Sequence, residues 1–312
     1  MTRRDLLTSA AALAGTAALQ AQPASPKLKI AIFSKHLQFL QGADLAKAAK
    51  DTGAEAIDLT VREGGHVEPA RVKQDLPPLV KLLHDAGLDT PMVTAGILDA
   101  TTPFAADILG TLNDLGIKYY RWGGFKWEKN KPIQQQLDEL RPRVAALAAL
   151  NAKYQATAMY HTHSGVGQVG ASIWDLHEIL KGQDPNLVSV NYDIGHATIE
   201  GGLGGWIESF RITGQHLKGI AVKDFIWQKN AKGVWVEAWQ PLGTGMVKFP
   251  QFFEMVRTSG FNGPLQLHFE YPLGGAENGK AKDLTMSPTD ILAAMKRDTT
   301  ALHNLLAAAK LA

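Results

Sequence analysis

The sequence contains no cysteine among its 312 residues. This absence excludes disulfide bonds, thiolate metal ligands and a cysteine nucleophile. The chain also lacks an excess of one charge, because 32 Lys and Arg residues stand against 30 Asp and Glu residues, a formal net charge of +2. The positive residues are scattered, so the sequence has no basic face of the kind that binds nucleic acid. We therefore expect a small-molecule ligand and no nucleic acid partner, and the composition allows oligomer formation.

Long apolar runs are also absent, except near the N-terminus. Arg3, Arg4 and Asp5 precede an Ala/Leu-rich stretch that ends at Leu19 and is followed by small residues and proline. A basic start, an apolar segment of about 12 residues and a small-residue exit are typical of a signal peptide, whereas a membrane span needs about 20 residues. The paired arginines resemble a twin-arginine export signal. We expect residues 1–25 to be a cleaved leader, the protein to be periplasmic, and no stable membrane insertion after cleavage; an attached amphipathic helix is the alternative.

From Lys27 onward, short apolar segments with strand character alternate with helical runs. The expected strands are 28–33, 54–59, 91–97, 117–122, 154–161, 187–193, 217–223 and 264–270. The clearest helices are 44–51, 72–86, 133–150, 173–180, 249–258 and 291–309. Eight strands that alternate with helices indicate a parallel sheet, and eight is the number that closes a barrel. We therefore predict a single (β/α)8 TIM barrel, of the α/β class, over residues 27–312.

An open, doubly wound sheet is the alternative architecture. It would place a glycine-rich phosphate loop after the first strand, where this chain has Phe33, Ser34, Lys35 and His36. The barrel is therefore favoured. The longest irregular stretches all follow expected strands, at 63–70, 123–131, 224–248 and 273–287. In a barrel such loops lie at the C-terminal face, where active sites are built.

Polar residues recur with a period of two near the ends of the expected strands. Because side chains alternate along a strand, Gln266, His268 and Glu270 share one face of the last strand and must point into the barrel. The same rule groups Asp58, Thr60 and Arg62; His161 and His163; Ser189, Asn191 and Asp193; and Gly219, Ala221 and Lys223. An Asp58–Arg62 ion pair is a structural alternative for one of these sets. Buried charges without partners are costly, so the sets together indicate a functional rim.

Four parts of the chain, in this order, resemble the xylose-isomerase-like barrel family of sugar and sugar-phosphate isomerases and epimerases. They are residues 160–163, 192–196, 222–224 and Glu270. The resemblance covers essentially the whole mature chain and extends to inosose dehydratase and dehydroshikimate dehydratase. It implies one divalent cation held by Glu, Asp, His and Glu from strands five to eight. It also implies proton transfer between two glutamates through an enediolate beside a ketose carbonyl.

The chain matches only part of that pattern. Asp193 and Glu270 stand at the sixth-strand and eighth-strand ligand positions, and His196 matches a position that contacts substrate. The fifth-strand glutamate is absent, and His161 or His163 stands in its place. One of the two carboxylate bases is therefore missing, so the two-glutamate mechanism does not transfer unchanged.

The seventh-strand histidine is also absent, because Ala221 stands two residues before Lys223. His268 lies on the adjacent strand and faces the lumen, so we expect it to replace that ligand. The expected metal ligands are Asp193, Glu270, His163 and His268. Such a set suits Mn²⁺, Co²⁺ or Zn²⁺ better than Mg²⁺. The alternative is a metal-free site in which Lys223, Arg62 and the histidines bind substrate oxygens directly.

The rim and the resemblance together predict an isomerase or epimerase that abstracts a proton next to a carbonyl of a free sugar, ketoglycoside or cyclitol. The expected catalytic residues are Glu270, His161, His163 and Lys223, and the expected substrate-binding residues are His196, Arg62, His66 and Trp122. A lyase or dehydratase of the same superfamily and a non-catalytic sugar-binding barrel are the alternatives. A phosphodiester endonuclease would need more His and Glu ligands and a basic face.

Overall fold

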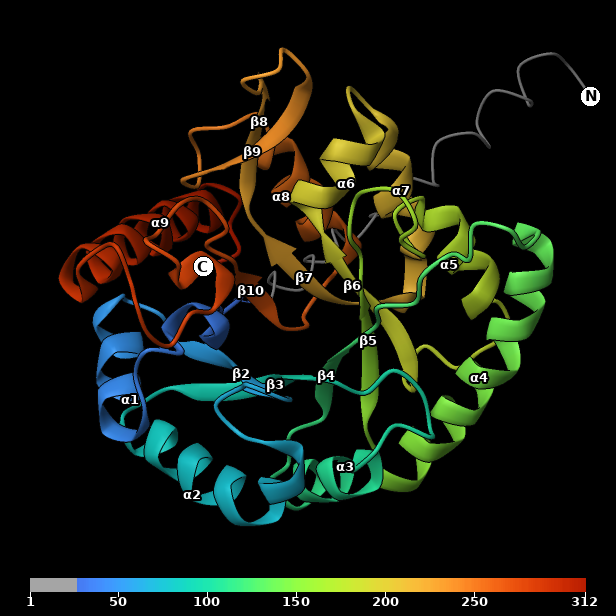
Figure 1. Ribbon diagram of the computed structural model, residues 1–312, viewed down its shortest axis with the longest axis horizontal. Coiled ribbons are helices and arrows are strands. Elements are labelled where there is room, and N and C mark those ends of the chain that lie inside the picture. The colour runs from blue at the N-terminus through green and yellow to red at the C-terminus, as the bar shows by residue number, and fades with distance from the viewer. Residues whose placement is uncertain (1–26) are drawn as a thin grey trace, which may run out of the picture.

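The computed structural model describes residues 27–312, so the expected leader, residues 1–25, lies outside the described residues. Eight parallel strands form a closed barrel inside a ring of helices (Figure 1). The strands are β1 (Ile30–Phe33), β2 (Ala56–Val61), β3 (Asp89–Ala95), β4 (Tyr119–Trp122), β5 (Thr157–His161), β6 (Val188–Asp193), β7 (Leu217–Val222) and β10 (Leu265–Leu267). Their order around the barrel is β1-β10-β7-β6-β5-β4-β3-β2. The predicted (β/α)8 TIM barrel is confirmed.

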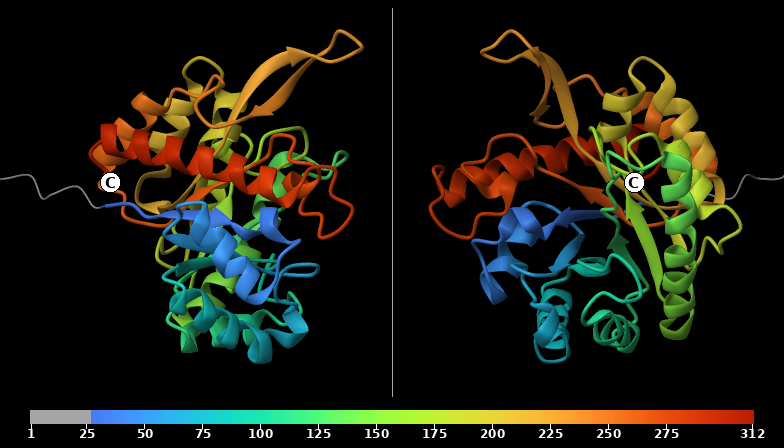
Figure 2. Two further views of the ribbon diagram at one scale, coloured as in Figure 1. Left: turned by 90° about the vertical axis from the view of Figure 1, so that its left-hand side faces the viewer. Right: turned by 45° about the vertical axis from the view of Figure 1, so that its right-hand side comes forward.

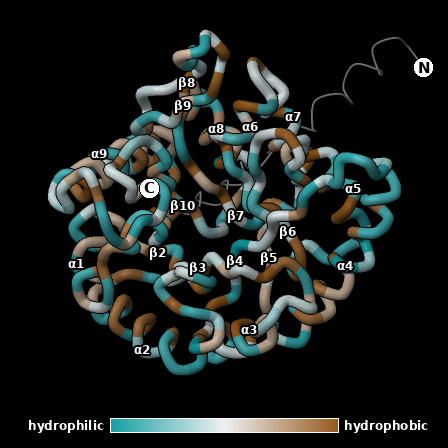
Figure 3. Tube along the Cα trace, in the orientation of Figure 1, coloured by the Kyte–Doolittle hydropathy of each residue, from teal (hydrophilic) through white to brown (hydrophobic). Residues whose placement is uncertain are grey.

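The helices pack their apolar sides onto the outside of this barrel. They are α1 (Gly42–Asp51), α2 (Val72–Asp85), α3 (Ala105–Asp114), α4 (Ile133–Tyr154), α5 (Ile173–Leu180), α6 (Ile194–Gly201), α7 (Gly205–Thr213), α8 (Phe249–Ser259) and α9 (Pro288–Ala308). In α2, for example, Val72, Leu76, Val80 and Leu83 are buried at the spacing of one helical face. Figure 3 shows the resulting alternation of hydrophobic and hydrophilic stretches along α2 and α3. Within residues 27–312, no helix has both the length and the apolar character that a membrane crossing requires.

The stretch 224–248 differs from the expected irregular loop. It contains an antiparallel hairpin, β8 (Asp224–Lys229) with β9 (Trp235–Gln240), which projects beyond the barrel (Figure 2). The turn forms because the Asn230 side chain accepts the N–H groups of Lys232 and Val234, and because Gly233 adopts a positive φ of 75°. The rim therefore carries an ordered arm at this point.

Strand β7 contributes little side-chain volume to the lumen, since its inward positions include Gly219 and Ala221. A Cβ added at Gly219 would lie 2.8 Å from Met159 Sδ and 3.0 Å from Asn191 Oδ1. The space lets the amide of Asn191, on β6, pass over β7 and donate to Gln266 Oε1 on β10 at 3.1 Å. The polar sets therefore point into the barrel, as the alternation predicts.

Candidate functional site

Three ligand-type side chains converge where β5, β6 and β10 end. One ligand atom from each of His161, Asp193 and His268 lies within 4.8 Å of the others. All three residues are buried. Within the described residues, His161 Nε2, Asp193 Oδ2 and His268 Nδ1 have no hydrogen-bond partner. Buried polar atoms are normally hydrogen-bonded. Asp193 Oδ2 has ion-pair contacts with Lys223 Nζ at 3.1 Å and His161 Nε2 at 3.4 Å, and the three atoms without hydrogen bonds form a site that fits a divalent cation.

The second nitrogen of each of these imidazoles faces a luminal amide. His268 Nε2 lies 3.4 Å from Gln266 Oε1, which holds the proton on Nε2 and leaves the Nδ1 lone pair for a ligand. His161 Nδ1 lies 3.2 Å from Asn191 Nδ2, and Asn191 Oδ1 has no partner among the described residues. Rotation of that amide would let Oδ1 accept the Nδ1 proton and free His161 Nε2, but it would also break the bond from Asn191 Nδ2 to Gln266 Oε1. Metal-bound histidines are commonly oriented by such neighbours.

His161 also approaches a second group of imidazoles, from His163 and His196, but the Nε2 atom of each already contacts a basic side chain. Arg121 Nη2 lies 3.2 Å from His163 Nε2, and Lys223 Nζ lies 2.7 Å from His196 Nε2. Burial lowers the pKa of His163 to about 3, and the charges of Arg121 and Lys223 act in the same direction. The set of His161, Asp193 and His268 is therefore the better ligand set.

Lys223 lies at the centre of the rim and is 3 % exposed. Its amine is 3.1 Å from Asp193 Oδ2 and 4.0 Å from Glu270 Oε1. The ring of Trp239, which the hairpin supplies, covers this amine at 4.4 Å from the ring centroid. Gly195 leaves room for the lysine, because a Cβ there would lie 2.8 Å from Lys223 Cγ. Lys223 can therefore donate hydrogen bonds to an oxygen atom held at the barrel mouth.

Glu270 is the accessible carboxylate of this group, with a side chain that is 24 % exposed. Lys35 Nζ donates to Glu270 Oε1 at 3.2 Å. Burial acts to raise the pKa of Glu270, but the charges of Lys223 and Lys35 outweigh burial and hold that pKa well below its usual range. Glu270 is therefore ionised at neutral pH, the form that can accept a proton.

The structure places Trp122 and His66 outside this cluster. Trp122 lies in the core behind β4, where its indole donates to the Leu98 carbonyl at 2.8 Å and packs edge-on against Tyr160. His66 Nδ1 lies 2.9 Å from Thr60 Oγ1 in the loop after β2. These contacts support the local structure, and neither side chain joins His161, Asp193 and His268.

Two charged residues at the rim were not among the expected site residues. Arg121 comes from β4 and Lys35 from the turn after β1. The sequence does carry a signal for Arg121, because Tyr120 and Trp122 on either side of it pack outward, so Arg121 must point inward. Lys35 follows the first strand directly, at the same end of the barrel as the other polar residues.

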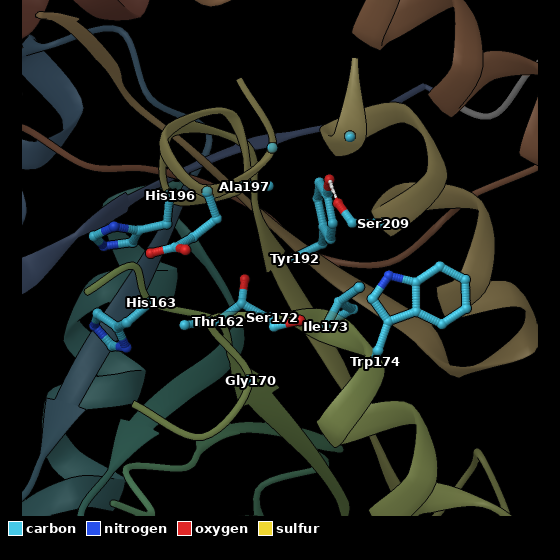
Figure 4. A pocket seen from close by; sticks show the side chains of 14 residues that line it. Thr162, His163, Gly170, Ser172, Ile173, Trp174, Tyr192, His196, Ala197 and Ser209 are labelled. Carbon is cyan, nitrogen blue, oxygen red and sulfur yellow. Dashed lines mark hydrogen bonds between the residues drawn. The ribbon is translucent and has the colours of Figure 1, made fainter. Parts of the chain in front are cut away.

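A cavity of about 150 Å³ opens beside the cluster. Figure 4 shows His163 and His196 on one side of it and Trp174 and Ser209 on the other. The hydroxyl of Tyr192 is bonded to Ser209 Oγ at 2.7 Å and is therefore held in place. The cavity extends the site from the barrel mouth toward α5 and α7.

The fold and the cluster define an α/β barrel with a buried His and Asp cluster that could hold a metal ion at its C-terminal mouth. The chain belongs to the xylose isomerase-like TIM barrel family, whose model matches residues 46–287. The sequence has no match among curated proteins.

Solved structures with low sequence identity share the fold. The IOLI protein, in a crystal structure with a binding zinc atom, is 12% identical with a TM-score of 0.68; the alignment covers 90% of this chain and 98% of that chain. The 3-keto-D-glucoside 4-epimerase of E. coli is 12% identical, with a TM-score of 0.65 and coverage of 89% and 100%. The probable 3-DHS dehydratase of Bacillus anthracis is 15% identical, with a TM-score of 0.62 and coverage of 88% and 99%.

Proposed function

We propose that this protein is a metal-assisted isomerase or epimerase that abstracts a proton next to a carbonyl of a free sugar, ketoglycoside or cyclitol. The observation that carries the proposal is the convergence of three buried ligand atoms that make no hydrogen bond, from His161, Asp193 and His268, beside the carboxylate of Glu270. Membership of the family and the likeness in fold to a 3-keto-D-glucoside 4-epimerase support it.

His161, Asp193 and His268 would hold the divalent cation, with Glu270 at the accessible side. This assignment differs from the expected ligand set in two ways. His161 replaces His163, because His163 Nε2 already accepts from Arg121, and Glu270, which is not among the converging ligand atoms, serves as the base. A set with two imidazoles suits Zn²⁺, Co²⁺ or Mn²⁺ better than Mg²⁺. When bound, the ion would polarise the substrate carbonyl and its neighbouring hydroxyl.

The residues around the ligands have separate tasks in this proposal. Glu270 accepts the proton from the carbon beside the carbonyl, and Lys35 keeps its carboxylate ionised and oriented. Lys223 donates a hydrogen bond to the oxygen on which negative charge develops. General-base catalysis by a positioned side chain contributes about 10²- to 10⁴-fold in rate, so the loss of Glu270 should cost about that much.

A lyase or dehydratase is the second candidate, favoured by one observation. His161 occupies the position where the family pattern has a second glutamate, and burial holds the pKa of His161 well below its ordinary value. A site with one carboxylate base and one cationic donor suits an elimination, in which Glu270 takes a proton and Lys223 protonates the leaving oxygen. The fold likeness to a probable 3-DHS dehydratase supports this candidate.

We also propose that the protein acts in the periplasm. The paired arginines and apolar stretch of residues 1–25 support this placement, and the absence of cysteine is compatible with an oxidising compartment.

The test uses full-length protein that is stripped of metal and then loaded with Zn²⁺, Co²⁺ or Mn²⁺ in separate samples. Each sample is incubated with ketoses, 3-ketoglycosides and cyclitol ketones, and NMR distinguishes epimers from unsaturated products. We expect metal-dependent turnover that falls at least about 100-fold in Glu270→Gln. The matched control is Glu254→Gln, on the exposed face of α8. Binding without turnover would favour the non-catalytic barrel, and equal turnover without metal would overturn the proposal.

A further inference from the structure

Two arginine side chains enter the barrel mouth beside the ligand cluster. Arg62 Cζ lies 5.8 Å and Arg121 Cζ lies 5.4 Å from the centroid of the Phe33 ring. The Phe33 ring lies 4.8 Å, between ring centroids, from His268. The two guanidinium groups therefore lie around one aromatic ring that touches the candidate metal site.

These guanidinium groups lack carboxylate partners. Within residues 27–312, no ion pair joins Arg62 or Arg121 to a carboxylate, and the polar contact of Arg121 is with the neutral His163. Asp58 is the nearby carboxylate, but both its oxygens accept from the Thr94 hydroxyl, at 3.0 and 2.8 Å. The Asp58–Arg62 ion pair considered above therefore does not form.

The negative charge of Asp58 offsets the positive charges of Arg62 and Arg121 only in part. Burial raises the pKa of Asp58 to about 7, against the opposing effects of Thr94, Arg121 and Arg62. Burial therefore disfavours the ionised form of Asp58 and weakens the counter-charge that this carboxyl offers the arginines. Arg121 in turn has a pKa lowered to about 10 by burial, and Arg62 acts in the same direction. The two arginines form a pair of like charges without full compensation.

The barrel mouth as a whole also holds more basic than acidic side chains. The basic side chains at the mouth are Lys35, Arg62, Arg121 and Lys223, and the acidic ones are Asp58, Asp193 and Glu270. A bound divalent cation would add two positive charges. A neutral ligand that covers the half-buried Arg62 would remove its charge from water without supplying a counter-charge, and such burial is costly.

We propose that the substrate carries a carboxylate, which binds between Arg62 and Arg121, so that its carbonyl and hydroxyl groups face the metal ligands. This inference rests on the proposed function and adds the substrate class, a sugar acid or cyclic polyol acid. Planar guanidinium groups match the two oxygens of a carboxylate in a fork geometry. Arg62 is only half-buried and also lines an open cavity with Thr102 and Phe104, so a ligand can reach it from solvent.

A phosphate is the competing anion, because guanidinium groups bind phosphate as well as carboxylate, but the turn after β1 has no glycine-rich loop to add to the arginines. Phosphate groups are commonly held by several backbone N–H groups at a glycine-rich loop or a helix N-terminus. Here the turn after β1 has the sequence Ser34-Lys35-His36, and the two arginines come from β4 and from the loop after β2. The geometry therefore favours the carboxylate.

The test is isothermal titration of the full-length, Zn²⁺-loaded protein with D-glucuronate, D-gluconate, D-glucose and D-glucose 6-phosphate. We expect the carboxylates to bind at least about tenfold more tightly than glucose, since removal of one partner of a desolvated charge pair costs that much or more. Arg62→Gln and Arg121→Gln should each lose this preference, and Arg62→Lys should keep part of it. The matched control is Arg211→Gln, at an exposed pair on α7.

Three results would overturn the inference: equal affinity for glucuronate and glucose, tightest binding of glucose 6-phosphate, or a preference for carboxylate that survives in Arg62→Gln. The half-exposed Arg62 remains a valid test if Arg121→Gln does not fold. The proposed function fails separately. Metal-dependent turnover of neutral ketoses without any effect of Arg62→Gln would reject the carboxylate and keep the isomerase. Arginine-dependent binding of carboxylates without turnover of any substrate would keep the carboxylate site and reject the isomerase.

Discussion

The amine of Lys223 lies 3.1 Å from Asp193 Oδ2 inside the barrel, and the same oxygen lies 3.4 Å from His161 Nε2. The lysine and a bound cation would therefore share one carboxylate oxygen. The arrangement suits catalysis, because a cationic donor sits beside the point where the carbonyl is polarised, but it weakens metal binding by repulsion.

Removal of that repulsion should strengthen metal binding. We expect Lys223→Met to raise the affinity for Zn²⁺ by roughly tenfold, since like charges a few ångströms apart repel by more than 1 kcal/mol in a partly buried site, while turnover falls. Competition with a chromogenic chelator measures the affinity. The control is Lys181→Met, whose side chain is 71% exposed. Unchanged affinity for Zn²⁺ in Lys223→Met would contradict the claim that the lysine and the cation share Asp193 Oδ2.

The two histidines at the end of β5, His161 in the strand and His163 just after it, should differ sharply in their effect on metal content. We expect His161→Ala to lower the affinity for Zn²⁺ at least about 100-fold, because His161 Nε2 is an unpartnered atom of the ligand set. His163→Ala should change it less than about threefold, because His163 already bonds to Arg121. Elemental analysis after dialysis against limiting chelator measures both, and the opposite ranking would restore His163 as the ligand.

His36 should make the metal-free protein sensitive to acid. His36 Nε2 accepts the backbone N–H of Phe269 at 3.2 Å, and burial lowers the pKa of His36 to about 3. The unfolded imidazole takes up a proton near pH 6.5, while the folded one does not, so stability is complete above pH 6.5 and falls as the pH drops toward 3. Each such group costs about 1.4 kcal/mol per pH unit in that window.

The test is urea unfolding of the metal-free protein at pH 7.0, 5.5 and 4.5. We expect the free energy of unfolding of His36→Gln to fall less steeply with pH than that of the wild type, by about one proton. Glutamine can accept and donate at this position, so the variant should remain folded. Parallel curves for the two proteins would show that His36 does not carry the effect.

The inward face of β7 has no room for an added methyl group at Gly219, because side chains from β5 and β6 already fill the space. We expect Gly219→Ala to lower the free energy of unfolding by about 1–3 kcal/mol, the cost of overpacking, because its Cβ would press on Met159 Sδ at 2.8 Å and on Asn191 Oδ1. The matched control is Gly205→Ala at the start of α7, where a Cβ meets no atom within 4 Å. Chemical denaturation compares the two, and equal stability would contradict the packing argument.

The barrel itself could be predicted from the sequence because each of its strands is a short apolar run between helices, and closed parallel strands must be buried on both sides. The hairpin at 224–248 could not be predicted in the same way. It lies outside the barrel, and several of its side chains are exposed, such as Trp235 at 62%. Its turn signal at Asn230 and Gly233 is local and gives no indication of the arm's position over Lys223.

The location of the site could be predicted from the sequence, but the choice of individual ligands could not. Alternation along the expected strand 264–270 placed His268 and Glu270 at the barrel mouth, where the structure has them just after the end of β10. The choice between His161 and His163 depends on which nitrogen atoms other side chains already occupy, and Arg121 determines that from another strand. Trp122 was expected at the site because of its aromatic ring, although its place in the alternation of β4 points it outward.

The central claim is that the metal-loaded site removes a proton from the carbon beside a carbonyl, with Glu270 as the base. The most direct test is solvent exchange in D₂O, followed by NMR, with a sugar ketone that the protein turns over or binds. The account predicts deuterium at the carbon next to the carbonyl with the metal-loaded wild type, and at least about 100-fold slower incorporation with Glu270→Gln. Incorporation at the same rate in both proteins, or none with metal-loaded wild type, would contradict it.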